Sequence, residues 1–390
     1  MERAELMRLL RVTGVAEECD GGFFLCDPRW GAAEREQVRR LQQLRAEDGA
    51  NEGWVCVPTG GTSGGIKFAR HDERTLLAAA RGFAEHFGIR KVNAVDVLPP
   101  FHVSGLMARV RCAVSGGTHV AWEWKRLERG ERPVVNEDEP WVISLVPTQL
   151  QRLLAVRESA EWLRRFGVVL IGGAAAWKEL LDAAAEKRVR VALSYGMTET
   201  AAMVAAQRPE EFLSGDRSSG TAMPHAQIAC GEDGTIAIEG ASLFRGYWPE
   251  WRTERRFETS DEGEIDASGR LHVRGRRDAV IITGGEKVNP LEVEAGLRAS
   301  GQFDDVAVVG VPDAEWGTAV VACYARGERA IDWCAVEREL AGLAGFKRPK
   351  RFVAVEAWPR NAQGKVNRAE LVRRASTAST VSEPGGEGGR

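Results

Sequence analysis

The sequence predicts an α/β protein with a large first domain of layered sheets and helices and a small second domain of the α+β class. Between residues 94 and 194, strand-like apolar runs alternate with helical segments, which is typical of layered α/β folds. From residue 235 the strands become shorter, and a further group of strands and helices begins near Ala279. We therefore expect a first domain at residues 1–277, a second domain at residues 278–374 and a disordered tail, rich in Ser, Thr, Gly, Glu and Pro, at residues 375–390.

The elements of the first domain follow from the spacing of apolar residues. Val38, Leu41 and Leu44 predict a helix over residues 34–47. Leu76 and Phe83 belong to a longer stripe at helical spacing, so a second helix is expected to begin near Asp72. Further strands are expected at residues 94–98, 141–146, 166–171, 189–194, 235–239 and 270–274, with a helix at residues 177–187, and the strand expected at residues 280–283 lies just beyond this domain.

The second domain contains a clear helix start. Asn289 suits the cap, Pro290 suits the first helical position, and Glu292 stands where a capping box needs an acidic side chain. Strands at residues 306–311, 319–325 and 351–355 and a helix at residues 331–343 complete this domain.

The composition excludes several classes of protein. The formal net charge of -3 argues against a general binder of nucleic acids or membrane surfaces. The seven cysteines are scattered and form no C-x-x-C pair, which fits reduced thiols and gives no zinc site. The N-terminus lacks the apolar core of a signal peptide, and no apolar run approaches the ~20 residues that cross a bilayer. We expect a cytoplasmic protein that does not span a membrane.

Residues 57–67, VPTGGTSGGIK, follow an apolar strand-like run. Glycines let successive N–H groups point into one concavity that suits phosphate oxygens, while the hydroxyl side chains and Lys67 add further donors. A Walker A loop is excluded because Ile66 stands where its lysine belongs. The loop predicts a different phosphate site, with a solvated linker as the alternative; its candidate residues are Thr59, Gly61, Thr62, Ser63, Gly64 and Lys67.

A second motif, YGMTE, occupies residues 195–199 after an expected strand. Tyr195 can stack on a purine ring, Thr198 can donate to a phosphate, and Glu199 can hold Mg²⁺. Between the two motifs, Gly172-Gly173-Ala174 ends another strand, where a flat ring can lie against bare backbone. Taken alone, that segment is equally consistent with an ordinary strand-to-helix turn.

Together these segments resemble the adenylate-forming superfamily of acyl-CoA synthetases, luciferases and adenylation domains. The loop is similar to [ST]-[ST]-G-[ST]-[ST]-G-x-P-K, from which Gly60 and Ile66 depart, and residues 195–199 match Y-G-x-T-E. The resemblance implies an ATP site that includes Gly196 and the 172–174 segment.

Two later motifs extend this resemblance. ETSDEGE at residues 258–264 resembles [YF]-x-T-G-D-x-G, although Ser260 replaces the glycine, and GRRDAVI at residues 275–281 resembles G-R-x-D-x-x-I. The resemblance implies that Asp261 accepts the ribose hydroxyls and that Arg276 is a second contact to ribose or phosphate. It also implies that Asp278 is the hinge at which a mobile second domain turns.

The acid site is expected at residues 99–111, PPFHVSGLMARVR. Ligands of open α/β sheets gather at the carboxyl ends of strands, and the segment resembles P-x-F-H-x-x-G, which lies beside the acyl pocket, so His102 is a candidate. Arg109 and Arg111 have apolar neighbours and either reach solvent or need an anionic partner. The segment is similar to that of o-succinylbenzoate:CoA ligases, which implies that Arg111 meets a carboxylate of the substrate.

In the second domain, TGGEKVNPLEVE resembles GG-x-x-V-x-P-x-E-V-E, which implies that Gly284 and Gly285 line a tunnel for the pantetheine of CoA. PRNAQGKVNR resembles P-x-[ST]-x-x-G-K-x-x-R, with Asn361 in place of the hydroxyl residue. The resemblance implies that Lys365 bridges the carboxylate and the α-phosphate during adenylation.

The resemblance as a whole implies an ATP-dependent ligase that forms an acyl-adenylate and transfers the acyl group to CoA. Lys365, Glu199 and His102 would be catalytic, and Glu199 would bind Mg²⁺. The phosphate loop begins within the first sixty residues, so we expect much of the N-terminal subdomain usual in this superfamily to be absent. Short chains of this kind look most like o-succinylbenzoate:CoA ligases of menaquinone or phylloquinone biosynthesis.

Three alternatives stay open at this point. The chain can be a CoA ligase for another aryl or fatty acid, a module that loads a carrier protein, or a regulator that binds nucleotide without catalysis. Whether it forms a homodimer is also open.

Overall fold

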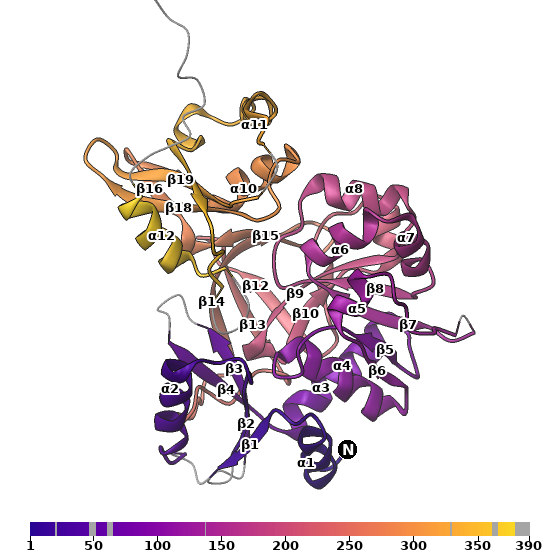
Figure 1. Cartoon of the computed structure of the whole chain (residues 1–390). Coiled ribbons are helices and arrows are strands. Elements are labelled where there is room, and N and C mark those ends of the chain that lie inside the picture. Colours follow the sequence, from indigo (N-terminus) through magenta and orange to yellow (C-terminus); the bar gives the residue numbers. More distant parts are fainter. Residues whose placement is uncertain are drawn as a thin grey trace, which may run out of the picture. The chain divides into compact units, whose positions relative to one another are not determined.

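The computed structural model describes residues 1–19, 22–46, 52–60, 65–136, 138–327, 330–360 and 366–378. They form two compact units (Figure 1). Unit 1 contains Met1–Gly61, Gly65–Ala176 and Leu180–Arg274, and unit 2 consists chiefly of Gly275–Arg390. The division lies three residues before the boundary expected from the sequence, while the hinge at Asp278 stays a prediction.

Unit 1 is organised around a seven-stranded sheet with the strand order β11-β10-β9-β8-β7-β5-β6. Strands β5 to β9 run parallel to one another, and β10 pairs in antiparallel fashion with β9 on one side and β11 on the other. Helices α3 and α4 lie on one side of the sheet and α6, α7 and α8 on the other (Figure 1), which confirms the expected α/β layering. The bounds are β5 Asn93–Asp96, β6 His119–Ala121, β7 Trp141–Leu145, β8 Val168–Ile171, β9 Val191–Met197, β10 Ala202–Ala206, β11 Thr221–Ala222, α3 Glu73–Phe87, α4 Val103–Ser115, α6 Pro147–Leu154, α7 Arg157–Leu163 and α8 Lys178–Glu186.

The strand order of this sheet reverses at β5. Strand β6 pairs with one side of β5, and β7, the next strand along the chain, pairs with the other. In open α/β sheets, ligands bind in the crevice outside the carboxyl ends of the strands at such a reversal. The segments found there are residues 97–102, which lead from β5 into α4, and Val146, which leads from β7 into α6.

Two four-stranded sheets complete unit 1, with the strand orders β1-β2-β3-β4 and β12-β13-β14-β15. Their strands are β1 Ala16–Cys19, β2 Gly22–Leu25, β3 Val55–Gly60, β4 Ile66–His71, β12 Ala226–Cys230, β13 Thr235–Gly240, β14 Arg256–Ile265 and β15 Leu271–Arg276. The remaining helices are α1 Arg3–Arg11, α2 Ala32–Gln42, α5 Trp124–Glu128, α9 Pro209–Leu213 and the 3₁₀ turn η1 Thr198–Thr200.

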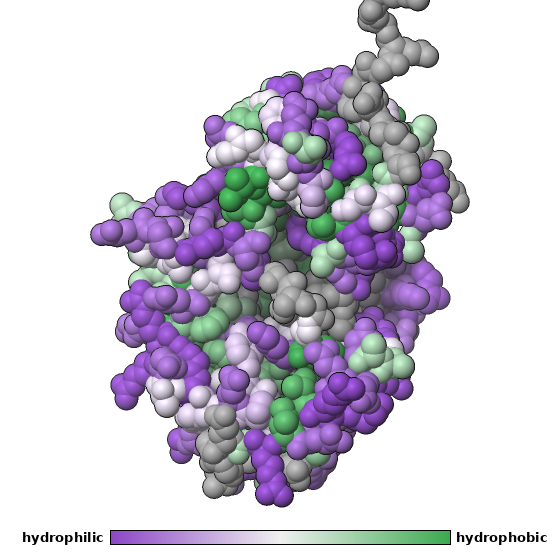
Figure 2. All heavy atoms as spheres, turned by 90° about the vertical axis from the view of Figure 1, so that its left-hand side faces the viewer, coloured by the Kyte–Doolittle hydropathy of each residue, from purple (hydrophilic) through white to green (hydrophobic). Residues whose placement is uncertain are grey.

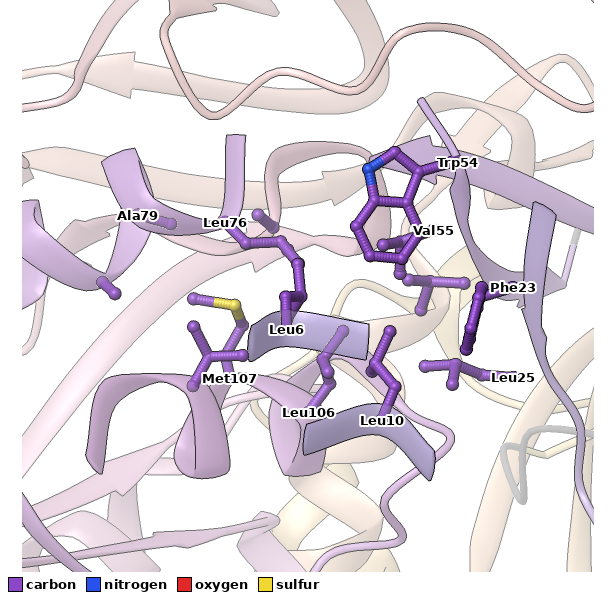
Figure 3. Close-up of a cluster of buried hydrophobic side chains, with 14 of the residues drawn as sticks. Leu6, Leu10, Phe23, Leu25, Trp54, Val55, Leu76, Ala79, Leu106 and Met107 are labelled. Atoms are coloured by element: carbon purple, nitrogen blue, oxygen red, sulfur yellow. The ribbon is translucent and has the colours of Figure 1, made fainter. Parts of the chain in front are cut away.

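Helix α1 closes a hydrophobic core near the first sheet. Leu6 and Leu10 are fully buried, and Figure 3 shows them between side chains of β2, β3, α3 and α4. Trp54 lies at the edge of the same cluster, and its indole N–H donates to Glu73 at 2.7 Å. The 3.6-residue period of α1 thus places its apolar stripe over the strand that leads into the phosphate loop.

Unit 2 has a two-stranded sheet, β16-β17, and a three-stranded sheet, β18-β19-β20. The carboxylate of Glu294, on α10, accepts from the backbone of Val308 and pairs with Arg298 and with Arg368, so it ties α10, β18 and α12 together. The bounds are β16 Ile281–Thr283, β17 Glu286–Val288, β18 Val306–Asp313, β19 Gly317–Ala325, β20 Arg351–Val355, α10 Pro290–Ala299, α11 Trp333–Leu340, α12 Arg368–Thr377, η2 Arg277–Ala279 and η3 Gly345–Lys347.

Three local expectations are wrong. Helix α2 ends at Gln42, and Leu44 is 43% exposed, because only the first half of the expected stripe faces the core. Asn289 caps α10 as expected, yet Glu292 pairs with Lys347 and closes no capping box. The tail expected from Ala375 is wrong at its start, because α12 continues to Thr377 and Ala375 is buried.

The surface carries mostly polar and charged side chains on the face drawn in Figure 2. Exposed large apolar residues in the described part of the chain are few and scattered, and Val134 at 91% is the most open. All seven cysteines are free thiols. The described residues include no helix with the length and apolar character that crossing a bilayer requires.

Candidate active site

The antiparallel pair β3-β4 carries the described part of the phosphate loop. Thr59 and Lys67 are direct partners across this pair, so the register brings one hydroxyl and one ammonium group to the same place. The Lys67 Nζ lies 5.2 Å from the centre of the Tyr247 ring, in a cation–π contact. Gly61, Thr62, Ser63 and Gly64 lie outside the described residues, and their predicted phosphate contacts stay predictions.

The carboxylate of Glu199 lies beside this pair. Glu199 is 8% exposed, and its Oε1 accepts from the Tyr247 hydroxyl at 2.8 Å and from the Thr59 hydroxyl at 3.4 Å. Both donors are neutral, and among the described residues no lysine or arginine pairs with Glu199 and no cluster of three or more metal-ligating side chains is found. A shielded carboxylate without a cationic partner in the described part of the chain can contribute to a divalent-cation site, and Mg²⁺ takes oxygen ligands of this kind with substrate phosphates.

Thr198, the neighbour of Glu199, is held from β4. Its carbonyl accepts from Nε2 of His71 at 2.7 Å, and the other ring nitrogen of His71 lies 3.1 Å from the Thr75 hydroxyl. Burial lowers the pKa of His71 to about 4, so the ring is neutral. This link fixes η1 against the strand that carries Lys67.

Tyr195 and Asp261 form a second pair. The Tyr195 hydroxyl donates to Asp261 Oδ2 at 2.7 Å, and the backbone N–H of Asp261 donates to the Thr259 hydroxyl at 3.0 Å. The Tyr195 ring packs in an apolar cluster and is 8% exposed. Its stacking on a purine stays a prediction, while the observed role of its hydroxyl is to orient the Asp261 carboxylate.

Gly196 has a steric reason to be glycine. A Cβ there would lie 2.0 Å from the carbonyl oxygen of Ala202 on the neighbouring strand β10. Gly172 and Gly173 follow β8, and Gly173 has a φ of +80°, which favours glycine. Ala174 is exposed next to them. The structure thus gives these residues local backbone roles, and their contacts to ATP stay predictions.

His102 stands at the start of α4, at the reversal point of the large sheet. Its ring lies 4.7 Å from that of Phe101, measured between centres. Gly105 makes this turn possible, because a Cβ there would lie 2.3 Å from the Pro99 carbonyl oxygen. The first turn of α4 therefore lies directly on the segment that leaves β5.

Arg111, in the third turn of α4, points into the interior. It is 4% exposed, its guanidinium carbon lies 4.3 Å from the centre of the Phe83 ring, and its Nε has no hydrogen-bond partner. Burial lowers its pKa to about 10, so the guanidinium is charged at neutral pH. The carboxylate of Asp96 is near enough to stabilise this charge, but no carboxylate of the described residues forms a direct ion pair with Arg111. The expected alternative that this side chain reaches solvent is wrong.

The site candidates of unit 2 are described within that unit. Arg276 pairs with Asp278 through two hydrogen bonds of 2.8 and 2.7 Å. Gly284 and Gly285 form the turn between β16 and β17, with φ values of +55° and +85°, which gives the glycine pair a turn role independent of CoA. Lys365 lies outside the described residues.

Sequence reasoning missed three residues that contact the predicted site residues, namely His71, Phe83 and Tyr247. Tyr247 is separated from Glu199 by 48 residues, and His71 from Thr198 by 127. Local spacing carries no signal for such contacts. The rarity of tyrosine, with three in the whole chain, was the one hint available for Tyr247.

An open groove of about 680 Å³ lies elsewhere on unit 1, between residues 224–227, 239–241, 243–245 and 251–255. Two of its arginines are engaged, since Arg245 pairs with Asp72 and Arg252 with Glu254. None of the predicted site residues in the described part of the chain lines this groove.

Residues 26–248 match the family of AMP-binding enzymes, and residues 292–365 match the C-terminal domain of AMP-binding enzymes. The chain belongs to the AMP-binding enzyme family. The first match covers more than half of the chain and includes the β3-β4 pair, α4 and the 195–199 motif. The resemblance expected from the motifs is therefore confirmed.

This AMP-binding enzyme is similar to several named proteins. A 2-succinylbenzoate–CoA ligase of Enterococcus faecalis is 34% identical over 325 residues, which cover 79% of this chain and 67% of the relative. A similar ligase of Listeria innocua is 33% identical, with 82% and 69% covered. The chain spans between 61% and 72% of the length of such curated relatives.

Several solved structures are also similar to this chain. The o-succinylbenzoate CoA synthetase of Bacillus subtilis in complex with its acyl-adenylate intermediate has a TM-score of 0.74 and 26% identity, and the match covers 92% of this chain and 78% of that one. The same synthetase with ATP and a magnesium ion has a TM-score of 0.69 and 26% identity, with 95% and 82% covered. The adenylate-forming fold class expected from the sequence is confirmed.

Proposed function

We propose that this chain is an AMP-forming acid–CoA ligase and that its acid is o-succinylbenzoate. The family membership and the named relatives support the reaction class. The observation that carries the choice of acid is Arg111, a buried cation with Asp96 nearby but with no directly paired carboxylate in the described part of the chain. An unpaired buried charge is costly, so a substrate that brings its own carboxylate to this position gains affinity.

o-Succinylbenzoate is a dicarboxylate, so one carboxylate can react while the other pairs with Arg111. Benzoate and simple fatty acids have only the reacting carboxylate. His102, at the start of the same helix, lies where the acid enters the crevice at the end of β5. The distance along α4 between these two residues, nine positions, corresponds to roughly 13 Å.

The reaction has two steps. A carboxylate oxygen of the acid attacks the α-phosphorus of ATP, and pyrophosphate leaves with the electrons of the broken P–O bond. The sulfur of the CoA thiolate then attacks the acyl carbon, and AMP leaves. The products are the CoA thioester, AMP and pyrophosphate, and the thioester would enter menaquinone or phylloquinone biosynthesis.

The residues of unit 1 have distinct proposed roles in these steps. Thr59 and Lys67 bind phosphate oxygens, and the Tyr195–Asp261 pair holds the ribose. Glu199 holds Mg²⁺, which when bound neutralises charge on the phosphates. Because two anionic groups must meet in the first step, these cationic and neutral donors lower its barrier.

Unit 2 would act by turning about Asp278 between the steps. Lys365 would serve the adenylation step, and the Gly284-Gly285 turn would serve the CoA step. The Arg276–Asp278 pair lies at this proposed hinge. A cytoplasmic location and a homodimer stay predictions.

The test compares acids and Arg111 variants. We expect CoA-dependent AMP formation with o-succinylbenzoate and little with benzoate or a medium-chain fatty acid. Arg111→Met keeps the contact with Phe83 and removes the charge, so kcat/KM for o-succinylbenzoate should fall by roughly 10²-fold or more. The kcat/KM of Arg111→Lys for o-succinylbenzoate should lie between those of the parent chain and Arg111→Met.

Turnover confined to benzoate or the fatty acid would keep the ligase and overturn the choice of acid. Equal loss of activity on all acids in Arg111→Met would show that Arg111 only supports the fold. No turnover with any acid, together with binding of ATP, would favour a nucleotide-binding regulator.

A further inference from the structure

Two of the three tyrosines of the chain donate to the two carboxylates proposed to bind the nucleotide and its metal. The Tyr195 hydroxyl donates to Asp261, and the Tyr247 hydroxyl donates to Glu199. The third, Tyr324, packs in the core of unit 2 against Phe303. Tyr195 belongs to a recognised motif, whereas nothing in the sequence assigned a role to Tyr247.

Tyr247 is fixed on several sides. Its backbone forms a β-bridge with Ala69 of β4, and its ring makes an edge contact with Phe244 at 4.9 Å between centres. The N–H of Phe244 in turn donates to the backbone carbonyl of Glu199 at 2.8 Å. The ring and the backbone of Glu199 are therefore parts of one rigid arrangement.

The hydroxyl of Tyr247 acts on one oxygen of the carboxylate only. Both Tyr247 and Thr59 donate to Oε1 of Glu199, so the described part of the chain leaves Oε2 to other ligands. Two neutral donors on one oxygen hold the orientation of the carboxylate without cancelling its charge.

The face of the same ring holds Lys67. Its Nζ lies 5.2 Å from the ring centre, and no ion pair joins Lys67 to Glu199 among the described residues. Lys67 is exposed whereas Glu199 is 8% exposed, so without the ring the ammonium group could turn toward the carboxylate, with an attraction that solvent weakens but does not remove. Their pairing would cancel the two charges that the phosphates and the metal need.

We propose that Tyr247 is a positioning residue that keeps Glu199 and Lys67 apart and orients Glu199 for the metal. The hydroxyl fixes the carboxylate, and the ring offers Lys67 a cation–π partner in place of Glu199. This inference rests on the proposed function, in which Glu199 holds Mg²⁺ and Lys67 binds phosphate.

The experiment measures the dissociation constant of Mn²⁺ by electron paramagnetic resonance, with a saturating non-hydrolysable ATP analogue. Tyr247→Phe removes the hydroxyl and keeps the ring, and it should weaken Mn²⁺ binding about tenfold. Tyr247→Leu removes both and should weaken binding further. Tyr324→Phe, the matched loss of a hydroxyl in unit 2, should leave Mn²⁺ binding unchanged.

A double variant tests whether Tyr247 keeps Lys67 away from Glu199, which we call its spacing role. Lys67→Gln in the Tyr247→Leu background should recover part of the lost Mn²⁺ affinity, because it removes the ammonium that would pair with Glu199. In the presence of Tyr247, the same Lys67→Gln change should give no such gain. Thermal unfolding of each variant shows whether it is folded, and Tyr247→Phe keeps the test valid if Tyr247→Leu is not.

The outcomes separate this inference from the proposed function. If Glu199→Gln loses Mn²⁺ binding while both Tyr247 variants bind as the parent does, the role of Tyr247 is wrong and the metal site stands. If Glu199→Gln binds Mn²⁺ as the parent does, the metal assignment of the proposed function fails as well. A Tyr247→Leu variant that gains nothing from Lys67→Gln would overturn the spacing role.

Discussion

His71 is fully buried and His225 is half-buried, and both are neutral imidazoles in unit 1. Burial is the main cause that lowers the pKa of each to about 4; Arg245 opposes protonation of His71, and Arg111 and His86 oppose that of His225. Asp72 and the carbonyl acceptors act in the other direction but do not restore the ordinary pKa. Both rings therefore resist protonation in the folded state.

We expect the free energy of unfolding to fall as the pH is lowered from about 6.5 to about 4. In this range the unfolded chain binds protons at these histidines and the folded chain does not, so stability rises with pH. Each histidine contributes at most roughly 3 kcal/mol to this change. Urea unfolding at several pH values would measure it.

The control is His225→Asn, which removes one titrating ring. Its free energy of unfolding should change less steeply over the same range than that of the parent chain. Parallel slopes for the two proteins would mean that His225 takes up its proton equally in the folded and unfolded chains.

Among elements, α1 illustrates how a short helix supports a site it does not touch. Its Leu6 and Leu10 are fully buried against the strand that leads into the phosphate loop. Leu6→Ala and Leu10→Ala should each lower the free energy of unfolding by about 2–5 kcal/mol, because each leaves a cavity.

Val12 is the matched site, since it is 78% exposed next to the same helix. Val12→Ala should change stability by less than about 0.5 kcal/mol in urea unfolding. If Leu6→Ala and Leu10→Ala change the free energy of unfolding as little as Val12→Ala does, the packing of α1 does not stabilise the core.

The turn between β16 and β17 carries a prediction about the second half-reaction. Gly285 has a φ of +85°, so Gly285→Ala strains the turn by about 1 kcal/mol. We expect slower thioester formation in single-turnover measurements and unchanged pyrophosphate exchange. Gly301→Ala, which has a φ of +65° in the same unit, is the control and should slow neither step. Equal effects on both half-reactions would remove the proposed CoA role of the turn.

Elements with strong local patterns could be predicted from the sequence. The strand at residues 351–355 has the expected bounds, and α3 begins after Asp72 with a capping box to Thr75. The end of α2 could not be predicted, because whether Leu44 faces the core depends on what packs there. The strand β4 was not predicted, because its first two residues belong to the segment 57–67 that was interpreted as a phosphate loop.

At the scale of the whole molecule, sequence motifs predicted which residues form the site, whereas only the structure shows which side chains those residues contact. Glu199 was expected as a metal ligand, but its contacts with Tyr247 and Thr59 join distant segments of the chain. Arg111 was expected to meet a carboxylate, and its burial against Phe83 depends on how α3 and α4 pack. Such nonlocal contacts leave no periodic signal in a single sequence.

The most direct test of the account is mass spectrometry of the products formed by the purified chain with ATP, Mg²⁺, CoA and o-succinylbenzoate. The account predicts the CoA thioester and AMP in equal amounts, and the acyl-adenylate when CoA is left out. Hydrolysis of ATP without thioester, or no reaction while the related ligase of Enterococcus faecalis reacts under the same conditions, would contradict it.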